Sequence, residues 1–210
     1  MKKALFLLTI LCVLLFMAQI SSASLVNGGF ESGNMTGWTL TGSGGVQTSV
    51  PDIGVKEGSY SGRISAGLGV DVYTTLSQTF DLAAGDTITG WYALRTSDRS
   101  YHDLAYGKIT TGSGSSYLWQ AEMPTPVIVG LNWVGKTDWT EWSWTAPESG
   151  TYTLEFGVAN VGNNSWSSTV YLDNITISAA PAAAVPIPPT VLLFGTGLVG
   201  LVFSRGRRKK

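Results

Sequence analysis

The central part of the chain alternates between apolar and polar side chains with a period of two, and this pattern constrains it to β structure. The segments 70–77 and 151–158 show the alternation most clearly, with valine, leucine, phenylalanine, tyrosine or threonine at every second position. Successive side chains of a strand point to opposite faces of a sheet, so both segments are expected to be half-buried antiparallel strands. No stretch of the same region keeps the 3.6-residue period of an amphipathic helix.

Other segments rich in β-branched and aromatic residues lie between runs of glycine, serine, asparagine and aspartate, which is the composition of strands and turns. We expect strands at 61–65, 88–95, 104–110, 116–123, 139–145 and 170–178. About nine strands in one domain predict an all-β fold, a jelly-roll β-sandwich of two sheets. The domain is expected to cover 24–179, which is long enough to bury a core of its own.

The N-terminal segment 1–23 has the three parts of a secretory signal peptide. Two lysines precede an apolar stretch, and small residues follow it up to Ala23. We therefore expect cleavage between Ala23 and Ser24 and export of the rest of the chain. The single cysteine, Cys12, leaves with this segment, so the exported domain must be stabilised by its core, or by a metal, without a disulfide.

The C-terminal end of the chain combines a proline motif, a short apolar run and a cluster of cations. A linker at 180–189 contains the motif, the apolar run spans 190–203 and the basic tail spans 204–210. As a helix the run would cover about 21 Å, less than the roughly 30 Å of bilayer hydrocarbon. A short transmembrane helix of this kind halts in the membrane with its cations on the cytoplasmic side. The motif consists of Val185, Pro186, Ile187 and Pro188, and the basic residues are Arg205, Arg207, Arg208, Lys209 and Lys210.

This order of motif, apolar helix and basic tail resembles the PEP-CTERM sorting signal of Gram-negative bacteria. Ile187 stands where the motif usually has glutamate. The resemblance implies that the chain is a substrate of an exosortase-type enzyme, which cleaves near Pro186 after a transient stay in the inner membrane. It also implies delivery to the cell surface or to an extracellular matrix of exopolysaccharide. The alternative is a permanent membrane anchor at the C-terminus.

Charge separates the body of the chain from its two ends. All fourteen acidic residues lie between Glu31 and Asp173, whereas only six of the thirteen lysines and arginines do. The exported domain therefore carries a formal charge of about −8. Because an acidic surface repels phosphate backbones, the composition argues against nucleic acid as a partner.

Short motifs recur along the body at 26–33, 57–62, 102–106, 156–160 and 170–175. In this order they resemble motifs of jelly rolls related to carbohydrate-binding modules, which share a galactose-binding-like fold. Those at 102–106 and 156–160 also resemble pieces of exported PEP-CTERM proteins. The resemblance covers almost the whole domain and implies a non-catalytic module that binds polysaccharide.

The same resemblance implies a structural calcium ion that joins the first strand to the last. Glu31 and Asp173 would supply carboxylates, and backbone carbonyls at 58–60 would complete the oxygen shell that calcium prefers. The alternative is that both carboxylates accept hydrogen bonds from backbone amides in tight turns. A zinc site is not expected, because the exported domain has no cysteine and a single histidine, His102.

The eight tryptophans can serve either a β core or a sugar-binding surface, because sugars stack on exposed aromatic rings. Trp38, Trp142 and Trp144 are expected in the core. Four others occur near glycine or asparagine, where their rings can be exposed to solvent. Among these we predict ligand contacts by Trp133 and Trp119.

Two functions from different classes remain after catalysis is considered. His102 lies in a polar cluster at 98–103, and its spacing from serines and aspartates matches no catalytic arrangement, so no enzymatic activity is expected. The first function is a module that holds polysaccharide through a shallow aromatic surface. The second is a structural protein of a biofilm or matrix that has no specific ligand.

Overall fold

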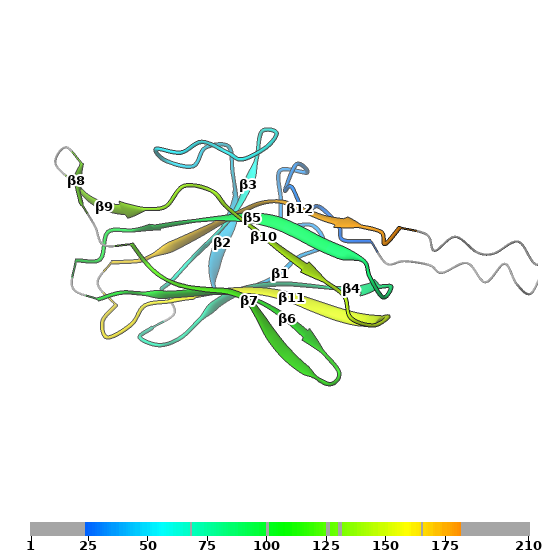
Figure 1. The fold of residues 1–210 in the computed structure, drawn as a ribbon. Helices are drawn as coiled ribbons and strands as arrows, with labels where there is room; N and C mark the ends of the chain where they lie inside the picture. Colours follow the sequence, from blue (N-terminus) through cyan, green and yellow to red (C-terminus); the bar gives the residue numbers. More distant parts are fainter. Residues whose placement is uncertain are drawn as a thin grey trace, which may run out of the picture. The chain divides into compact units, whose positions relative to one another are not determined.

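The computed structural model describes residues 24–67, 69–99, 101–124, 127–129, 132–164 and 166–181, with the backbone alone for 127–129, 132 and 133. These residues form β-strands connected by turns and loops (Figure 1). The strands are β1 (Thr39–Thr41), β2 (Ser43–Gln47), β3 (Ser61–Ser65), β4 (Thr74–Leu82), β5 (Thr87–Thr96), β6 (Leu104–Thr111), β7 (Gly114–Glu122), β8 (Val127–Val129), β9 (Asn132–Lys136), β10 (Thr140–Thr145), β11 (Gly150–Ala159) and β12 (Thr169–Ser178).

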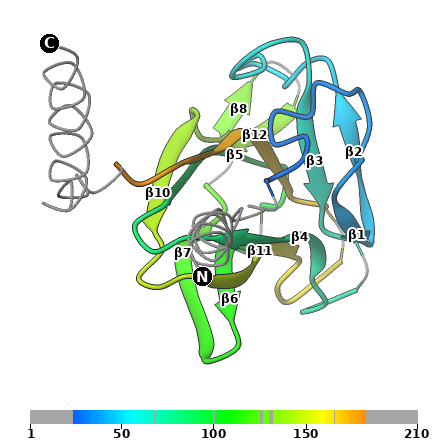
Figure 2. The same cartoon turned by 90° about the vertical axis from the view of Figure 1, so that its right-hand side faces the viewer.

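The strands pair into two antiparallel sheets that lie one over the other (Figures 1 and 2). The five-stranded sheet has the order β1-β4-β11-β6-β7. The seven-stranded sheet has the order β2-β3-β12-β5-β9-β8, and its β10 pairs with β5. Consecutive strands from β3 to β6 alternate between the sheets, as they do in a jelly roll. The predicted all-β fold with two sheets is therefore confirmed.

Most predicted strands coincide with observed ones. β3 has the predicted bounds, and β5, β6, β7, β10, β11 and β12 lie within two residues of prediction at either end. The strand predicted at 70–77 needs a correction, because it begins only at Thr74. Asp71 has a φ of 58°, which an extended strand does not allow, and Val70 and Val72 are 42% and 45% exposed. The short strands β1, β2, β8 and β9 were not predicted.

The core lies between the sheets, with Phe156 of β11 fully buried near its middle. The ring centroid of Phe156 lies 6.2 Å from that of Trp38 and 5.9 Å from that of Trp142. The ring of Trp144 packs edge-on against Tyr152 at 5.3 Å. The predicted core positions of these three tryptophans are confirmed, the first two buried and Trp144 half-buried.

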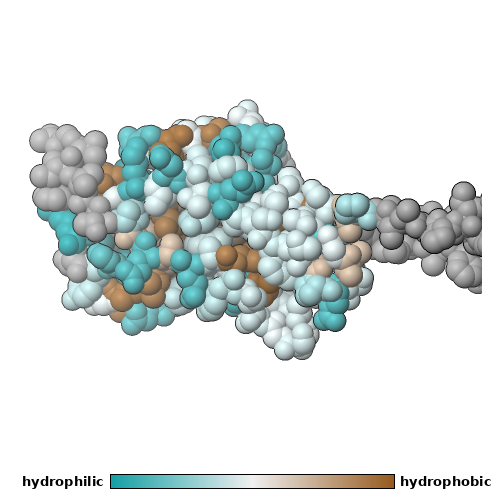
Figure 3. All heavy atoms as spheres, viewed as in Figure 1, coloured by the Kyte–Doolittle hydropathy of each residue, from teal (hydrophilic) through white to brown (hydrophobic). Residues whose placement is uncertain are grey.

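The outer face of the seven-stranded sheet is partly covered by the segment 48–58. Val50 of this segment is buried against Ala93 of β5 and Tyr171 of β12. Lys56 places its Nζ 3.5 Å from the centroid of the Trp91 ring. Figure 3 shows one side of the molecule, where apolar residues form small patches separated by hydrophilic ones.

Candidate functional site

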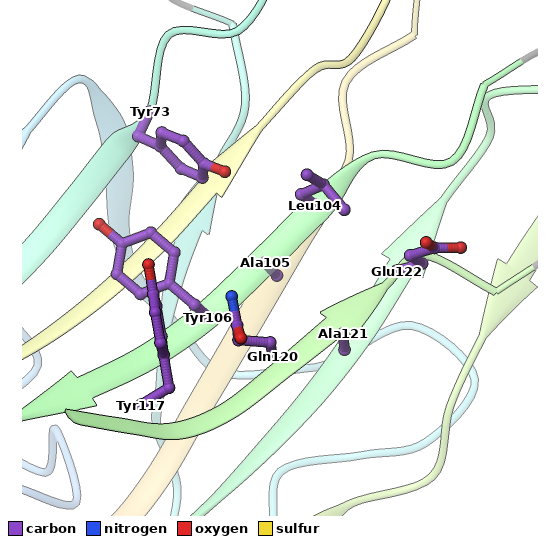
Figure 4. Close-up of a pocket in the computed structure, with 8 residues that line it drawn as sticks. All are labelled: Tyr73, Leu104, Ala105, Tyr106, Tyr117, Gln120, Ala121 and Glu122. Atoms are coloured by element: carbon purple, nitrogen blue, oxygen red, sulfur yellow. The ribbon is translucent and has the colours of Figure 1, made fainter.

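Tyrosines from three segments meet on the outer face of the five-stranded sheet. In β6, Ala105 and Ile109 are buried and face the core, so Tyr106, on the opposite phase of the alternation, faces outward. Tyr117 lies in the neighbouring strand β7, and Tyr73 immediately precedes β4. Figure 4 shows their three side chains close together over the sheet.

The rings form an edge-to-face cluster around Tyr106. Its ring centroid lies 5.2 Å from that of Tyr73, at an interplanar angle of 61°, and 5.7 Å from that of Tyr117, at 82°. Edge-to-face rings at such distances attract each other, which holds the cluster together. Tyr117 nevertheless keeps 54% of its surface exposed, so the cluster presents an aromatic surface to solvent.

Gly157 of β11 makes room for the ring of Tyr106. The two residues are direct partners in the antiparallel ladder. A Cβ atom at Gly157 would lie 2.4 Å from the Tyr106 ring, closer than real Cβ atoms approach. The ring can therefore lie across the neighbouring strand only because that position has no side chain.

Tyr106, Lys108 and Glu155 form a polar group beside the rings. The Tyr106 hydroxyl donates a hydrogen bond to Glu155 Oε1 at 2.6 Å, and Lys108 Nζ lies 2.8 Å from the same oxygen. Burial raises the pKa of Tyr106, and its hydrogen bond to Glu155 raises that pKa further. Burial also acts to raise the pKa of Glu155, but the hydrogen bonds from Lys108 and Tyr106 outweigh it and hold that pKa below its usual value. At neutral pH the group therefore contains a neutral phenol and a carboxylate that is paired with Lys108.

A hollow of about 330 Å³ extends from the tyrosines along β6 and β7 (Figure 4). Gln120, the register partner of Tyr106, lies beside the rings, and Leu104 and Glu122 line the other end of the hollow. His102 Nδ1 lies 3.2 Å from Glu122 Oε2, with both side chains more than half exposed. The hollow thus combines aromatic surface with amide, phenol and carboxylate groups, which together can pack on and hydrogen-bond a polyhydroxylated ligand.

Trp119 does not belong to this face. Its ring stacks on Tyr92 of the other sheet at 3.9 Å and lies 6.2 Å from Phe156. The register of β7 with β6 shifts just beyond Gly107, which pairs with Trp119. The expectation of an exposed ring at Trp119 is therefore corrected: this ring packs on the core side of β7, and Tyr117 occupies the outer face.

The other predicted aromatic contact, Trp133, lies in β9 opposite Ile128 of β8. Its side chain lies outside the described part of the structure, so its contact with a ligand stays a prediction. Trp166 is 53% exposed, whereas Trp139 is half-buried and donates from Nε1 to the carbonyl oxygen of Gly54 at 3.1 Å.

Glu31 and Asp173, the predicted calcium ligands, both accept hydrogen bonds from backbone amides. Asp173 is fully buried, and its Oδ2 accepts from the amides of Lys56 and Glu57 at 2.9 and 3.1 Å. Glu31 Oε1 accepts from the amides of Ser59 and the following residue at 3.1 and 3.0 Å. The loop at 56–60 therefore binds both Glu31, which precedes the first strand, and Asp173 of the last strand.

The electrostatics of these two carboxylates are compatible with a cation. Burial and, to a smaller extent, the charge of Glu31 raise the pKa of Asp173 to about 6, although the backbone hydrogen bonds that Asp173 accepts act to lower it. A cation would relieve this repulsion, although the amides alone also satisfy both groups. Within the described ranges, no three histidine, cysteine, aspartate or glutamate side chains gather closely enough to hold a metal ion. Calcium at this place stays a prediction.

The predicted targeting segments fall outside the described residues. These are the signal peptide 1–23, nearly all of the linker 180–189, the apolar run 190–203 and the tail 204–210. In the part of the chain that is described, there is no helix with the length and hydrophobicity needed to cross a membrane. Signal cleavage, the sorting motif and the transmembrane helix therefore stay predictions.

The tyrosine cluster was not predicted from the sequence. Part of it could have been found: if β6 and β7 are assumed to pair as a hairpin, Lys108 lies opposite Tyr117, as observed. Tyr73 and Glu155 come from distant segments, and only the order of strands in the sheet brings them to the same place.

Comparison with known proteins gives similarity to solved structures alone. No protein-family model and no curated protein matches the chain. The structure of TmCBM61 in complex with β-1,4-galactotriose is 18% identical over 76% of this chain and 99% of that one, with a TM-score of 0.49. A family 16 carbohydrate-binding module is 18% identical over 73% of this chain and 98% of that one, with a TM-score of 0.44. The K3 adhesin domain of Lys-gingipain from Porphyromonas gingivalis is 12% identical over 78% of this chain and 100% of that one, with a TM-score of 0.46.

Proposed function

We propose that this domain is a non-catalytic module that binds polysaccharide on the outer face of its five-stranded sheet. The observation that supports the proposal most is the cluster of Tyr73, Tyr106 and Tyr117 beside an open hollow of about 330 Å³. Sugar rings have flat C–H surfaces that pack on aromatic rings and hydroxyl groups that exchange hydrogen bonds with polar side chains. Tyr117 and Gln120, on one strand, offer both kinds of contact.

The charges around the hollow favour a neutral glycan. Glu155 is paired with Lys108, and Glu122 faces His102, so the described residues around the hollow offer no concentration of positive charge to hold uronates or sulfates. The exported domain as a whole is acidic, which repels polyanionic chains. We therefore infer a neutral polysaccharide as the ligand class.

A glycan array probed with the purified protein in detergent micelles tests this function. Tyr117→Ala removes the most exposed ring of the hollow and is expected to lower binding about tenfold, the loss that one aromatic contact of about 1.4 kcal/mol brings. Trp166→Ala is the matched control, because Trp166 is 53% exposed against 54% for Tyr117 but does not line the hollow. A blank array, or equal loss in both variants, overturns the proposal and favours a structural matrix protein.

The function further includes export and sorting. The signal peptide, the motif at 185–188 and the basic tail support a protein that is exported, held transiently in the inner membrane and released to the cell surface or matrix by an exosortase-type enzyme. Such a location would place the tyrosine face among exopolysaccharides. A permanent anchor is the alternative outcome of the same signals.

A structural calcium ion at Glu31 and Asp173 is part of the proposal. It is supported by the loop at 56–60, whose amides hold both carboxylates, and by the absence of cysteine from the exported domain. Thermal unfolding in calcium and in chelator tests it. Calcium is expected to raise the melting temperature by about 5 °C, and Glu31→Gln to remove part of that gain. An identical gain in the Glu31→Gln protein contradicts this site and leaves the amide hydrogen bonds as the role of Glu31.

A further inference from the structure

One end of the core is closed by polar side chains instead of apolar ones. The members of this polar end have exposed fractions of 2% or less and are Thr96, Asp98, Asp103, Asn160 and Ser168. Asp103 and Asn160 adjoin strands of the five-stranded sheet, Thr96 is the last residue of β5, and Asp98 and Ser168 adjoin strands of the seven-stranded sheet. Burying polar groups costs free energy unless each finds a partner, and burying charge costs more. This concentration of buried oxygens therefore requires a physical reason.

The strand register brings Asp103 and Asn160 together. Ala159 of β11 pairs with Leu104 of β6, so the next residues along, Asn160 and Asp103, lie opposite each other. Both side chains point to the core side of the sheet. The Cβ atoms of directly opposite residues in an antiparallel pair lie about 5 Å apart. The amide of Val161 donates to Asp103 Oδ1 at 2.9 Å and holds the two segments in this arrangement.

Ser168 connects this pair to the other sheet. Its Oγ lies 2.5 Å from Asp103 Oδ2 and 2.6 Å from Thr96 Oγ1. The amide of Asp98 donates to the same threonine oxygen at 3.0 Å. Through Thr96 and Ser168, these hydrogen bonds link the segment of Asp98 to the carboxylate of Asp103.

The side-chain oxygen of Asn160 has no hydrogen-bond donor among the described residues, although Asn160 is fully buried. The amide nitrogen of the same side chain does have a partner, because it donates to Asn164 Oδ1 at 2.7 Å. A buried acceptor without a donor costs about 1–3 kcal/mol. A buried amide oxygen without a donor, opposite the buried carboxylate of Asp103 and joined by the buried Asp98, is an arrangement that a cation would stabilise.

We propose that this polar end binds one hard divalent cation of the calcium type, with oxygens of Asp103, Asn160 and Asp98 among its ligands. Calcium takes carboxylate and amide oxygens in irregular geometry, whereas zinc prefers nitrogen and sulfur, so a site built from oxygens favours calcium over zinc. The ion ties both sheets together at one end of the core. The site shares no residue with the one predicted at Glu31 and Asp173.

Calorimetric titration of the purified protein in detergent micelles tests the proposal, with Glu31→Gln present throughout to weaken the other predicted site. We expect calcium to bind with a dissociation constant of about 10⁻⁴–10⁻³ M, the range of extracellular modules. The same protein is expected to melt at higher temperature in calcium than in chelator. A flat titration of this variant overturns the proposal, whether or not the unmodified protein binds calcium.

Substitutions at Asn160 separate ligation of a cation from packing. Asn160→Asp keeps the shape and adds a charge, so calcium affinity is expected to rise about tenfold and the thermal gain from calcium to grow. Asn160→Ala is expected to weaken calcium binding about tenfold. If Asn160→Asp instead lowers the melting temperature equally in calcium and in chelator, the proposal is wrong, and a protonated Asp103 that donates to Asn160 explains the polar end.

Discussion

At the scale of single residues, the tyrosine face depends on Gly157. Gly157→Ala brings a methyl group to 2.4 Å from the Tyr106 ring, which must rotate away from Glu155. We expect a loss of about 1–3 kcal/mol in the free energy of unfolding and weaker glycan binding. Urea unfolding and the glycan array measure the two effects. Gly45→Ala in β2 is the control, because no atom lies within 4 Å of its added Cβ; equal effects of the two substitutions would contradict this account.

Glu155 makes the stability of the same face depend on pH. Its pKa in the folded protein lies below the usual value, so its charged form contributes stability that is present above about pH 4.3 and is lost as the pH falls through the folded-state pKa. Because the pair with Lys108 is about a quarter exposed, we expect Glu155→Gln to be less stable by only about 1 kcal/mol near pH 7.

Thermal unfolding of the Glu155→Gln and unmodified proteins between about pH 2 and pH 8 measures this dependence. The difference in melting temperature is expected to shrink toward the acidic end, where the carboxyl is protonated in both the folded and the unfolded state. A difference that stays constant across the whole range would show that the Glu155 charge does not contribute.

At the scale of elements, strand β7 separates the core from the candidate site. Trp119 stacks on Tyr92 and packs on the core side, whereas Tyr117 is 54% exposed on the other. Trp119→Ala is therefore expected to lower the free energy of unfolding by about 3 kcal/mol, and Tyr117→Ala by less than about 1 kcal/mol. Denaturant unfolding of both variants checks this, and a larger loss for Tyr117→Ala would contradict the assignment of the two faces.

The elements themselves could be predicted from the sequence to different extents. Long strands with strict alternation, such as β11, were predicted because half of their side chains must be buried. The short β2, with its two glycines, was missed, because its pairing with β3 depends on the sheet and not on local preference. The segment before β4 was mistaken for strand, because alternation continues through Asp71 although its backbone turns there.

The candidate site was less predictable than the strands for a physical reason. A shift of register beyond Gly107 decides which aromatic side chain of β7 is exposed and which is buried. The amino-acid composition does not indicate this shift. The meeting of Tyr73 with Tyr106 depends on the order of strands in the sheet. Of the two tryptophans predicted to contact a ligand, Trp119 packs on the core side and Trp133 stays a prediction, whereas the tyrosine cluster was missed.

At the scale of the whole molecule, the two ends of the chain are expected to be removed. Intact mass spectrometry of the protein recovered from its native host is expected to give a chain that starts at Ser24 and ends near Pro186. The proposed reason is that the apolar run at 190–203, as a helix too short to span the bilayer well, would hold the chain in the membrane only until an exosortase-type enzyme cleaves it. Recovery of the complete hydrophobic C-terminus would instead support a permanent anchor.

The central claim, that the outer face of the five-stranded sheet binds polysaccharide, is tested most directly by mapping NMR chemical-shift changes. The probe is the glycan that gives the strongest signal on the array. We predict that the largest changes lie in β6 and β7 around Tyr106 and Tyr117, with little change in β3 and β12. Changes centred on β8 and β9 around Trp133, with none near the tyrosines, would contradict the account.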